Sequence, residues 1–199
     1  PGMTIIVADG TYAPIRSDNK SVTIRSVNGA AKTIIDGGYP AATNRCVYAG
    51  GLAGYTNTVI RGFTIQNGCT YGMSTINGAG VAGGTLYDCV VRDNHSGKNG
   101  GGTCYSVLYN CVVEGNSCSN QGGGSYSSTA YDCTFINNAC ATNGAGVCQG
   151  VLNNCTVISN RSEHGGGGVY LATLTNCVVQ GNEALTYGGG TQSSSLYEC

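Results

Sequence analysis

The sequence predicts a right-handed parallel β-helix, an all-β solenoid in which successive coils of one chain stack on each other. Three features recur every 22 residues: a cysteine, an asparagine and a glycine-rich triplet. The cysteines are Cys89, Cys111, Cys133, Cys155, Cys177 and Cys199. The asparagines are Asn94, Asn116, Asn138, Asn160 and Asn182, and the triplets are 78–80, 100–102, 122–124, 144–146, 166–168 and 188–190. Because a fixed period indicates a repeat architecture, we expect about seven to eight coils.

The residues between the triplets favour short strands over helices. They are rich in Val, Thr, Tyr and Cys, which β-structure favours, and they lack the apolar periodicity of a helix. In Cys89-Val90-Val91 the side chains alternate inward, outward and inward, and Val81 opens a further strand after its triplet. We therefore expect three short strands and three turns in each coil, with every strand paired in register to its copy in the next coil.

The whole chain, 1–199, is expected to form one β-helix domain with two kinds of coil. Residues 79–199 supply the regular coils and 1–78 supply irregular ones, with strands expected at Thr4–Val7, Val22–Ile24 and Thr33–Ile35. The segment Val59–Ile65 aligns with the regular coils through inward-facing Ile60, Phe63 and Ile65. Since the last residue falls in the middle of a repeat, we expect the chain to be a fragment of a longer protein.

The cysteine and asparagine columns are expected to be structural ladders that point inward. A disulfide between neighbouring coils needs Cβ atoms about 3.8 Å apart, whereas the coils lie about 4.8 Å apart, so we expect the cysteine column to be reduced. Cys118 and Cys140 share a column in a variable turn, where the backbone can shift, and form the candidate disulfide. Cys104 and Cys148 are expected to face outward and to lie too far apart to bridge.

Composition and charge argue against nucleic-acid binding and against a transmembrane helix. The net charge is −1 and 10% of the residues are charged, so no basic patch is available to neutralise the phosphates of a nucleic acid. No apolar run reaches the length of about 18 residues that a transmembrane helix requires. The 34 glycines and three prolines fit a repetitive fold with many tight corners.

Two stretches resemble the right-handed β-helix repeat proteins of the pectin-lyase-like superfamily. They are Ile34-Ile35-Asp36-Gly37-Gly38 and the segment that runs from Val59 to Gly68. The Gly-Gly-Gly-Thr starts, paired with Phe135-Ile136-Asn137-Asn138, resemble the repeats of polymorphic outer-membrane and autotransporter passenger proteins. The resemblance implies a bacterial, secreted or cell-surface protein. It implies little about activity, because this fold hosts lyases, hydrolases and adhesins.

The regular coils offer no recognisable catalytic or metal site, so the sequence favours a protein that is not an enzyme and has no cofactor. A glycosidase needs two carboxylates about 5–9.5 Å apart, yet Asp88 and Asp132 are two coils apart with Asn110 between them. We interpret these three as turn-forming residues. Arg92 and Glu114 are expected to form a surface ion pair. His95 and His164 lie three coils apart and out of register, so they cannot share a metal ion.

An outward column of tyrosines, formed by Tyr87, Tyr109 and Tyr131, is the candidate glycan-stacking surface. Flat aromatic side chains can stack on sugar rings, although tyrosines can equally serve to cover the sheet. The partners expected on this basis are glycans or molecules of a host or cell surface.

Three functions follow from this pattern. The first is a structural or adhesive surface scaffold that displays variable turns on a constant frame. The second is a carbohydrate-active enzyme, a polysaccharide lyase or glycoside hydrolase, with catalytic coils outside this chain or in the irregular region 36–78. The third is a filament subunit that assembles head to tail through the open strand edges of its terminal coils.

Overall fold

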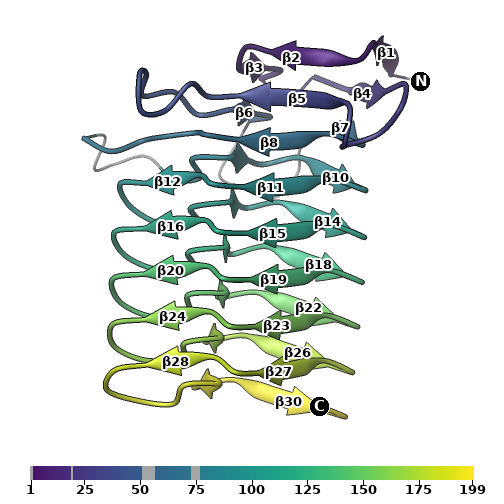
Figure 1. Cartoon of the computed structure of the whole chain (residues 1–199). Coiled ribbons are helices and arrows are strands. Elements are labelled where there is room, and N and C mark those ends of the chain that lie inside the picture. The colour runs from purple at the N-terminus through teal and green to yellow at the C-terminus, as the bar shows by residue number, and fades with distance from the viewer. Residues whose placement is uncertain (1, 19, 51–56, 73–76) are drawn as a thin grey trace.

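The computed structural model describes residues 2–18, 20–50, 57–72 and 77–199. They form a parallel β-solenoid of about eight coils, which confirms the predicted fold class and coil number. The two chain ends lie at opposite ends of the stack (Figure 1). No helix of the described residues is long and apolar enough to span a membrane.

Two long parallel sheets, here called sheets A and B, run the length of the stack. Sheet A contains β1 (Met3–Val7), β4 (Val22–Ser26), β7 (Thr58–Arg61), β10 (Thr85–Tyr87), β14 (Val107–Tyr109), β18 (Thr129–Tyr131), β22 (Val151–Asn153), β26 (Thr173–Thr175) and β30 (Ser195–Tyr197). Sheet B contains β2 (Gly10–Tyr12), β5 (Thr33–Asp36), β8 (Thr64–Gln66), β11 (Val90–Arg92), β15 (Val112–Glu114), β19 (Thr134–Ile136), β23 (Thr156–Ile158) and β27 (Val178–Gln180).

Two further sheets, C and D, are built from strands of two residues each. Sheet C contains β3 (Ile15–Arg16), β6 (Val47–Tyr48), β9 (Val81–Ala82), β13 (Thr103–Cys104), β17 (Ser125–Tyr126), β21 (Val147–Cys148), β25 (Val169–Tyr170) and β29 (Thr191–Gln192). Sheet D contains β12 (His95–Ser96), β16 (Ser117–Cys118), β20 (Ala139–Cys140), β24 (Arg161–Ser162) and β28 (Glu183–Ala184). A regular coil therefore has four strands. The expected three was wrong, because the segment after each ladder asparagine, assigned to a turn, also pairs with its copies.

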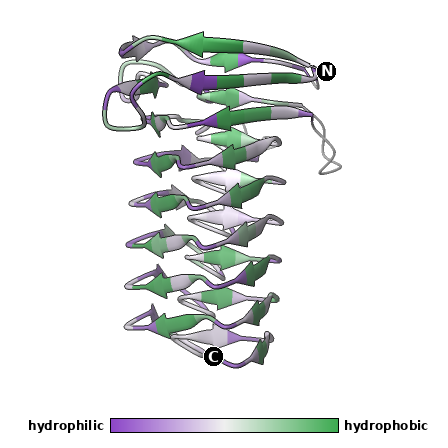
Figure 2. Cartoon of the chain, turned by 90° about the vertical axis from the view of Figure 1, so that its right-hand side faces the viewer, coloured by the Kyte–Doolittle hydropathy of each residue, from purple (hydrophilic) through white to green (hydrophobic). Residues whose placement is uncertain are grey.

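The interior is a set of apolar columns that continue from coil to coil. Leu86, Leu108 and Leu152 of sheet A have no exposed surface, and Val91 and Val113 of sheet B are equally buried. The strands of successive coils repeat the same hydrophobic positions (Figure 2). One coil alone would leave these side chains in water, so the burial that stabilises the fold, roughly 1.5–3 kcal/mol for each side chain, depends on stacking.

Corners between strands use the left-handed backbone region, in which Asn and Asp are well tolerated. Asp88 has a φ of 55° and Asn110, one coil later, has a φ of 50°. The column continues through Asp132, Asn154 and Asn176, all with positive φ. Asn110 Nδ2 donates to Asp88 Oδ1 over 2.7 Å, and Asn154 Nδ2 donates to Asp132 Oδ1 over 3.0 Å. These side chains thus connect successive corners on the surface.

Candidate functional site

The asparagine column forms a continuous hydrogen-bonded ladder inside the solenoid. Asn138 is 1% exposed. Its Nδ2 donates to Val113 O and to Asn160 Oδ1, both over 2.9 Å. Its Oδ1 accepts the backbone N–H and the Nδ2 of Asn116, each over 3.0 Å. Asn94 and Asn160 are also fully buried, and Asn182 near the end of the stack is half-buried. The ladder thus occupies the polar groups of the buried amides of Asn116, Asn138 and Asn160.

The cysteine column lies beside the apolar core and is fixed by local hydrogen bonds. Cys89, Cys111, Cys133, Cys155 and Cys177 are free thiols and at most 3% exposed, whereas Cys199 is a free, exposed thiol. The Sγ of Cys111 donates to Tyr109 O over 3.2 Å, and the Sγ of Cys133 donates to Tyr131 O over 3.1 Å. The neighbouring thiol of Cys111, together with burial, raises the pKa of Cys133 to about 12. Such thiols are unreactive at neutral pH.

Sheet A presents an outward column in which two arginines precede the three tyrosines. Arg25 pairs in register with Arg61, Arg61 with Tyr87, and the column continues to Tyr109 and Tyr131. The Tyr87 and Tyr109 rings stack with centroids 4.7 Å apart, and the Tyr109 and Tyr131 rings with centroids 4.9 Å apart. The Arg61 guanidinium lies 3.9 Å from the centroid of Tyr87. Because the rings stack on each other, a sugar ring cannot stack on Tyr109; the column offers phenol edges and hydroxyl groups instead.

A hollow of about 250 Å³ lies beside the two arginines. Its lining includes Arg25, Arg61, Ser26 and Asp88. Both arginines are exposed, and neither takes part in the three ion pairs found among the described residues. The sequence alone did not predict this cationic pair. The insertion after Ile65 hides the correspondence between Arg61 and Tyr87, so the spacing in the sequence starts the column at Tyr87.

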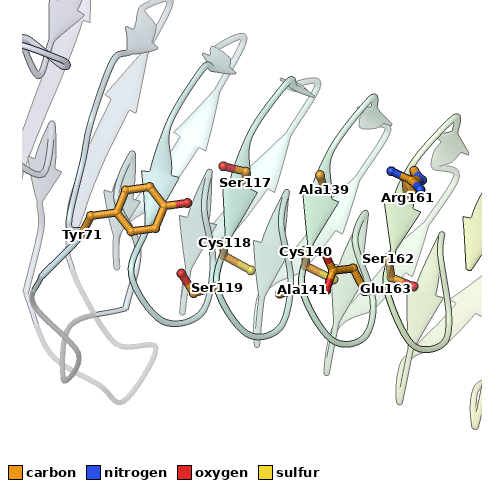
Figure 3. Close-up of a pocket in the computed structure, with 10 residues that line it drawn as sticks. All are labelled: Tyr71, Ser117, Cys118, Ser119, Ala139, Cys140, Ala141, Arg161, Ser162 and Glu163. Atoms are coloured by element: carbon orange, nitrogen blue, oxygen red, sulfur yellow. The ribbon is translucent and has the colours of Figure 1, made fainter. Parts of the chain in front are cut away.

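A second cavity, of about 300 Å³, opens on the edge formed by sheet D. Figure 3 shows residues from three successive coils around it, together with Tyr71. Cys118 and Cys140 pair in register on β16 and β20 and are 4% and 5% exposed. Arg161 and Glu163 come from the next coil. Cys118 and Cys140, the candidate disulfide, are present as two free thiols.

The structure corrects two expectations about the outer face. Cys104 and Cys148 occupy outward positions of sheet C, but neither is exposed, because glycine turns and neighbouring side chains cover them. Arg92 does not form the expected ion pair with Glu114. Its Nε and Nη2 instead donate to Gln66 Oε1 over 3.0 and 2.8 Å, and the carboxylate nearest to it is that of Asp93, at 3.9 Å.

The irregular region 36–78, where catalytic coils were an alternative, contains one acidic residue, Asp36. Gln66 and Asn67 each donate to Asp36 Oδ2 over 2.9 Å, and Gly38 donates to its Oδ1 over 2.8 Å. Burial opposes ionisation of this carboxyl, but these hydrogen bonds prevail and lower its pKa. Asp36 is therefore an ionised turn-forming residue. Across the described ranges, no three His, Cys, Asp or Glu side chains lie close enough to hold one metal ion.

Comparison with known proteins gives one family and two structures. Residues 52–195 match the family model of NosD, described as a periplasmic copper-binding protein. No curated protein matches the chain. Among solved structures, it is similar to the Dettilon tailspike protein, with 12% identity and a TM-score of 0.48, over 97% of this chain and 39% of the tailspike chain. It is also similar to the A-module of the mannuronan C-5 epimerase of Azotobacter vinelandii, with 17% identity and a TM-score of 0.40, over 98% of this chain and 68% of the module. The family match spans more than half of the sequence, and the chain therefore belongs to the NosD family.

Proposed function

We propose that this chain is a non-enzymatic scaffold, exported to the periplasm or the cell surface, that binds an acidic glycan along the outward column of sheet A. The periplasmic description of the NosD family supports export. The inward residues form the apolar columns and the asparagine ladder, which stabilise the solenoid. The outward residues are left to recognise a partner.

The observation that carries the proposal is the register pairing of Arg25 with Arg61. The backbones of the two arginines are one coil apart, about 4.8 Å in a parallel sheet, so two exposed positive charges lie on neighbouring coils and favour the binding of an anion. A guanidinium binds a carboxylate or sulfate through paired hydrogen bonds. The stacked phenols of Tyr87, Tyr109 and Tyr131 continue the same line and can donate to sugar hydroxyls. An acidic polysaccharide lying parallel to the solenoid axis satisfies both parts of the column.

The same column favours binding over catalysis. Hydrolysis of a glycosidic bond by the usual mechanism uses two carboxylates facing the bond. Asp88 is the carboxylate that lines the hollow, and Asn110 donates a hydrogen bond to it over 2.7 Å. The pairing with Asn110 and the positive φ of Asp88 support a role for this residue in the corner of the coil.

Copper, the metal in the family description, fits the described residues at one place, the pair formed by Cys118 and Cys140. His95 and His164 lie on different coils, so imidazole groups cannot converge on one ion. Thiolates favour the soft Cu(I) ion, and Cys118 and Cys140 are two free thiols in register at the wall of a cavity. They are the residues that would hold copper, which would supply Lewis acidity and one-electron chemistry when bound.

The glycan proposal is tested by calorimetry with the full chain and two polymers, acidic polygalacturonate and neutral dextran. We expect binding to polygalacturonate alone, weakened by salt because exposed charges are screened. The double variant Arg25→Ala/Arg61→Ala should lose at least about tenfold in affinity, since each charge-assisted contact contributes about 1.5–3 kcal/mol.

Arg92→Ala is the matched control, because this arginine lies on sheet B and donates to Gln66. It should bind polygalacturonate as the parent does. Equal binding to dextran, or an equal loss in Arg92→Ala, would refute the proposal. Unchanged melting temperatures would show that the variants are folded.

A further inference from the structure

The hollow beside Arg25 and Arg61 also contains a carboxylate, that of Asp88. Asp88 is exposed, and one of its two carboxylate oxygens, Oδ1, accepts a hydrogen bond from Asn110 Nδ2 over 2.7 Å. Among the described residues, no side-chain donor contacts the other oxygen, Oδ2, and no arginine or lysine forms an ion pair with Asp88. One oxygen therefore fixes the corner of the coil, while the other is free to accept a hydrogen bond from a ligand.

A glycine keeps the space beside this carboxylate open. Gly62 occupies the same corner one coil earlier, because Arg61 and Tyr87 are register partners and Gly62 N donates to Tyr87 O over 3.0 Å. A Cβ at residue 62 would lie 2.6 Å from Ser26 Oγ, so the corner has no room for a side chain. The Arg61 guanidinium lies over the Tyr87 ring, 3.9 Å from its centroid, and leaves Asp88 unpaired.

The lining of the hollow therefore combines two guanidinium groups with one carboxylate. A partner that carried only negative charges would be attracted by the arginines and repelled by Asp88. A ligand that satisfies both has an anionic group with hydrogen-bond donors close to it, and a uronic acid unit has this combination in its carboxylate and hydroxyl groups. The hollow of about 250 Å³ is smaller than the roughly 300–1,000 Å³ of pockets for larger ligands, so it suits one such unit.

We infer that Asp88 is the specificity-determining residue of the outward column of sheet A. Its Oδ2 accepts hydrogen bonds from the unsubstituted hydroxyl groups of the uronic acid unit whose carboxylate lies at Arg25 and Arg61. The inference rests on the proposed binding of an acidic glycan. It adds that the protein selects acidic sugars with free hydroxyl groups over O-acylated sugars and over polyanions without hydroxyl groups, because a group that pairs with a hydroxyl is left unpaired by an analogue that lacks it.

The test is the substitution Asp88→Asn in the full chain. It replaces the free acceptor, Oδ2, by an amide group that only donates, and it keeps the oxygen that Asn110 contacts. Asparagine already occupies this corner, with positive φ, at residues 110, 154 and 176, so the variant should fold. Calorimetry compares three polymers: polygalacturonate, O-acetylated polygalacturonate, and polyglutamate, which has carboxylates but no hydroxyl groups.

We expect the parent to bind polygalacturonate at least about fivefold more tightly than either other polymer, since hydrogen bonds to a charged group are among the stronger ones. Asp88→Asn should lose this preference by weakening the binding of polygalacturonate alone. The direction of the change separates hydrogen bonding from charge. The substitution removes a negative charge, so electrostatics alone would make every polyanion bind more tightly.

Asp93→Asn is the matched control. Asp93 lies on the same coil as Asp88, is exposed and has a φ of 52°, but it occupies the corner that follows sheet B. Its substitution removes the same charge and should keep the preference for polygalacturonate. Melting temperatures equal to that of the parent establish that both variants are folded.

The inference is overturned if Asp88→Asn tightens polygalacturonate binding as much as Asp93→Asn does, or if the parent binds the acetylated polymer as tightly as the unmodified one. Either result would leave the glycan proposal standing, provided that Arg25→Ala/Arg61→Ala still loses affinity for polygalacturonate. A parent that binds none of the three polymers would refute the glycan proposal itself, and the role of Asp88 with it.

Discussion

Asn138 Oδ1 accepts two hydrogen bonds from Asn116, one from the backbone N–H and one from Nδ2, each over 3.0 Å. The same relationship recurs between Asn138 and Asn160 and between Asn160 and Asn182. These coils are therefore joined to each other by side-chain amides as well as by strand pairing, and the amides of Asn116, Asn138 and Asn160 are buried.

Asn138→Leu is expected to destabilise the solenoid by about 3 kcal/mol or more. The substitution leaves two donors of Asn116 without an acceptor, and an unsatisfied buried group costs about 1–3 kcal/mol. Urea unfolding followed by circular dichroism measures the change. Hydrogen exchange should show the largest loss of protection in the coils on either side of residue 138.

Asn137→Gly is the control for this substitution. Asn137 is exposed, but it has a φ of 54°, so a leucine there would strain the backbone and confuse the comparison. Glycine adopts this conformation readily, and Asn137→Gly should unfold within about 0.5 kcal/mol of the parent. Equal losses in the two variants would show that the amide ladder does not stabilise the fold.

Gly124→Ala should destabilise the chain because two coils approach too closely to admit a methyl group. A Cβ at residue 124 would lie 2.6 Å from the backbone oxygen of Gly146 in the next coil. Gly190 occupies the same column near the end of the stack, where the closest atom would be a methyl group of Val179 at 3.7 Å. We expect a loss of about 1–3 kcal/mol for Gly124→Ala and almost none for Gly190→Ala. Thermal melts of the two variants compare them directly, and a Gly190→Ala loss equal to that of Gly124→Ala would contradict the close approach.

Alkaline pH should unfold the protein through its buried thiols. Cys111 and burial raise the pKa of Cys133 to about 12, and Cys133 and burial do the same for Cys155. The ordinary value is 9.0, so the unfolded chain loses these protons at lower pH than the folded one. Stability is then intact below about pH 9 and falls as the pH rises towards about 12, by up to about 1.4 kcal/mol per thiol per pH unit.

Urea midpoints measured in the presence of a reductant from neutral pH to about pH 11 test this dependence. Cys133→Val removes one of the titrating groups and should flatten the decline. A midpoint that stays constant across this range would mean that the thiols ionise as readily in the folded chain as in the unfolded one.

The fold could be predicted from the sequence because the same residue types recur at a constant spacing. The columns of Cys111 and Asn116 keep one side-chain type through the regular coils, so the repeat directly records the inward face. The number of strands was predicted less well. A strand of two residues, such as Ser117–Cys118, has no alternation to reveal it, and its identity depends on pairing with neighbouring coils.

The candidate surfaces were predicted only in part, because outward residues are not fixed by packing. The tyrosine column was visible from its spacing, but the stacking of its rings and its continuation to Arg25 and Arg61 depend on side-chain conformation and on an insertion in the irregular coils. Cys104 illustrates the same limit. Strand alternation placed it outward, yet neighbouring turns bury it completely.

The most direct test of the scaffold account is to incubate polygalacturonate with the protein, measure how much polymer the protein retains, and analyse the recovered polymer for cleavage. The chain should retain the polymer on an affinity gel through Arg25 and Arg61, while the nuclear magnetic resonance spectrum and size distribution of the recovered polymer stay those of a buffer control. Appearance of unsaturated uronides, new reducing ends or shorter chains above that control would show an enzyme. Failure to retain the polymer at low salt would show that the arginine and tyrosine column does not bind acidic glycans.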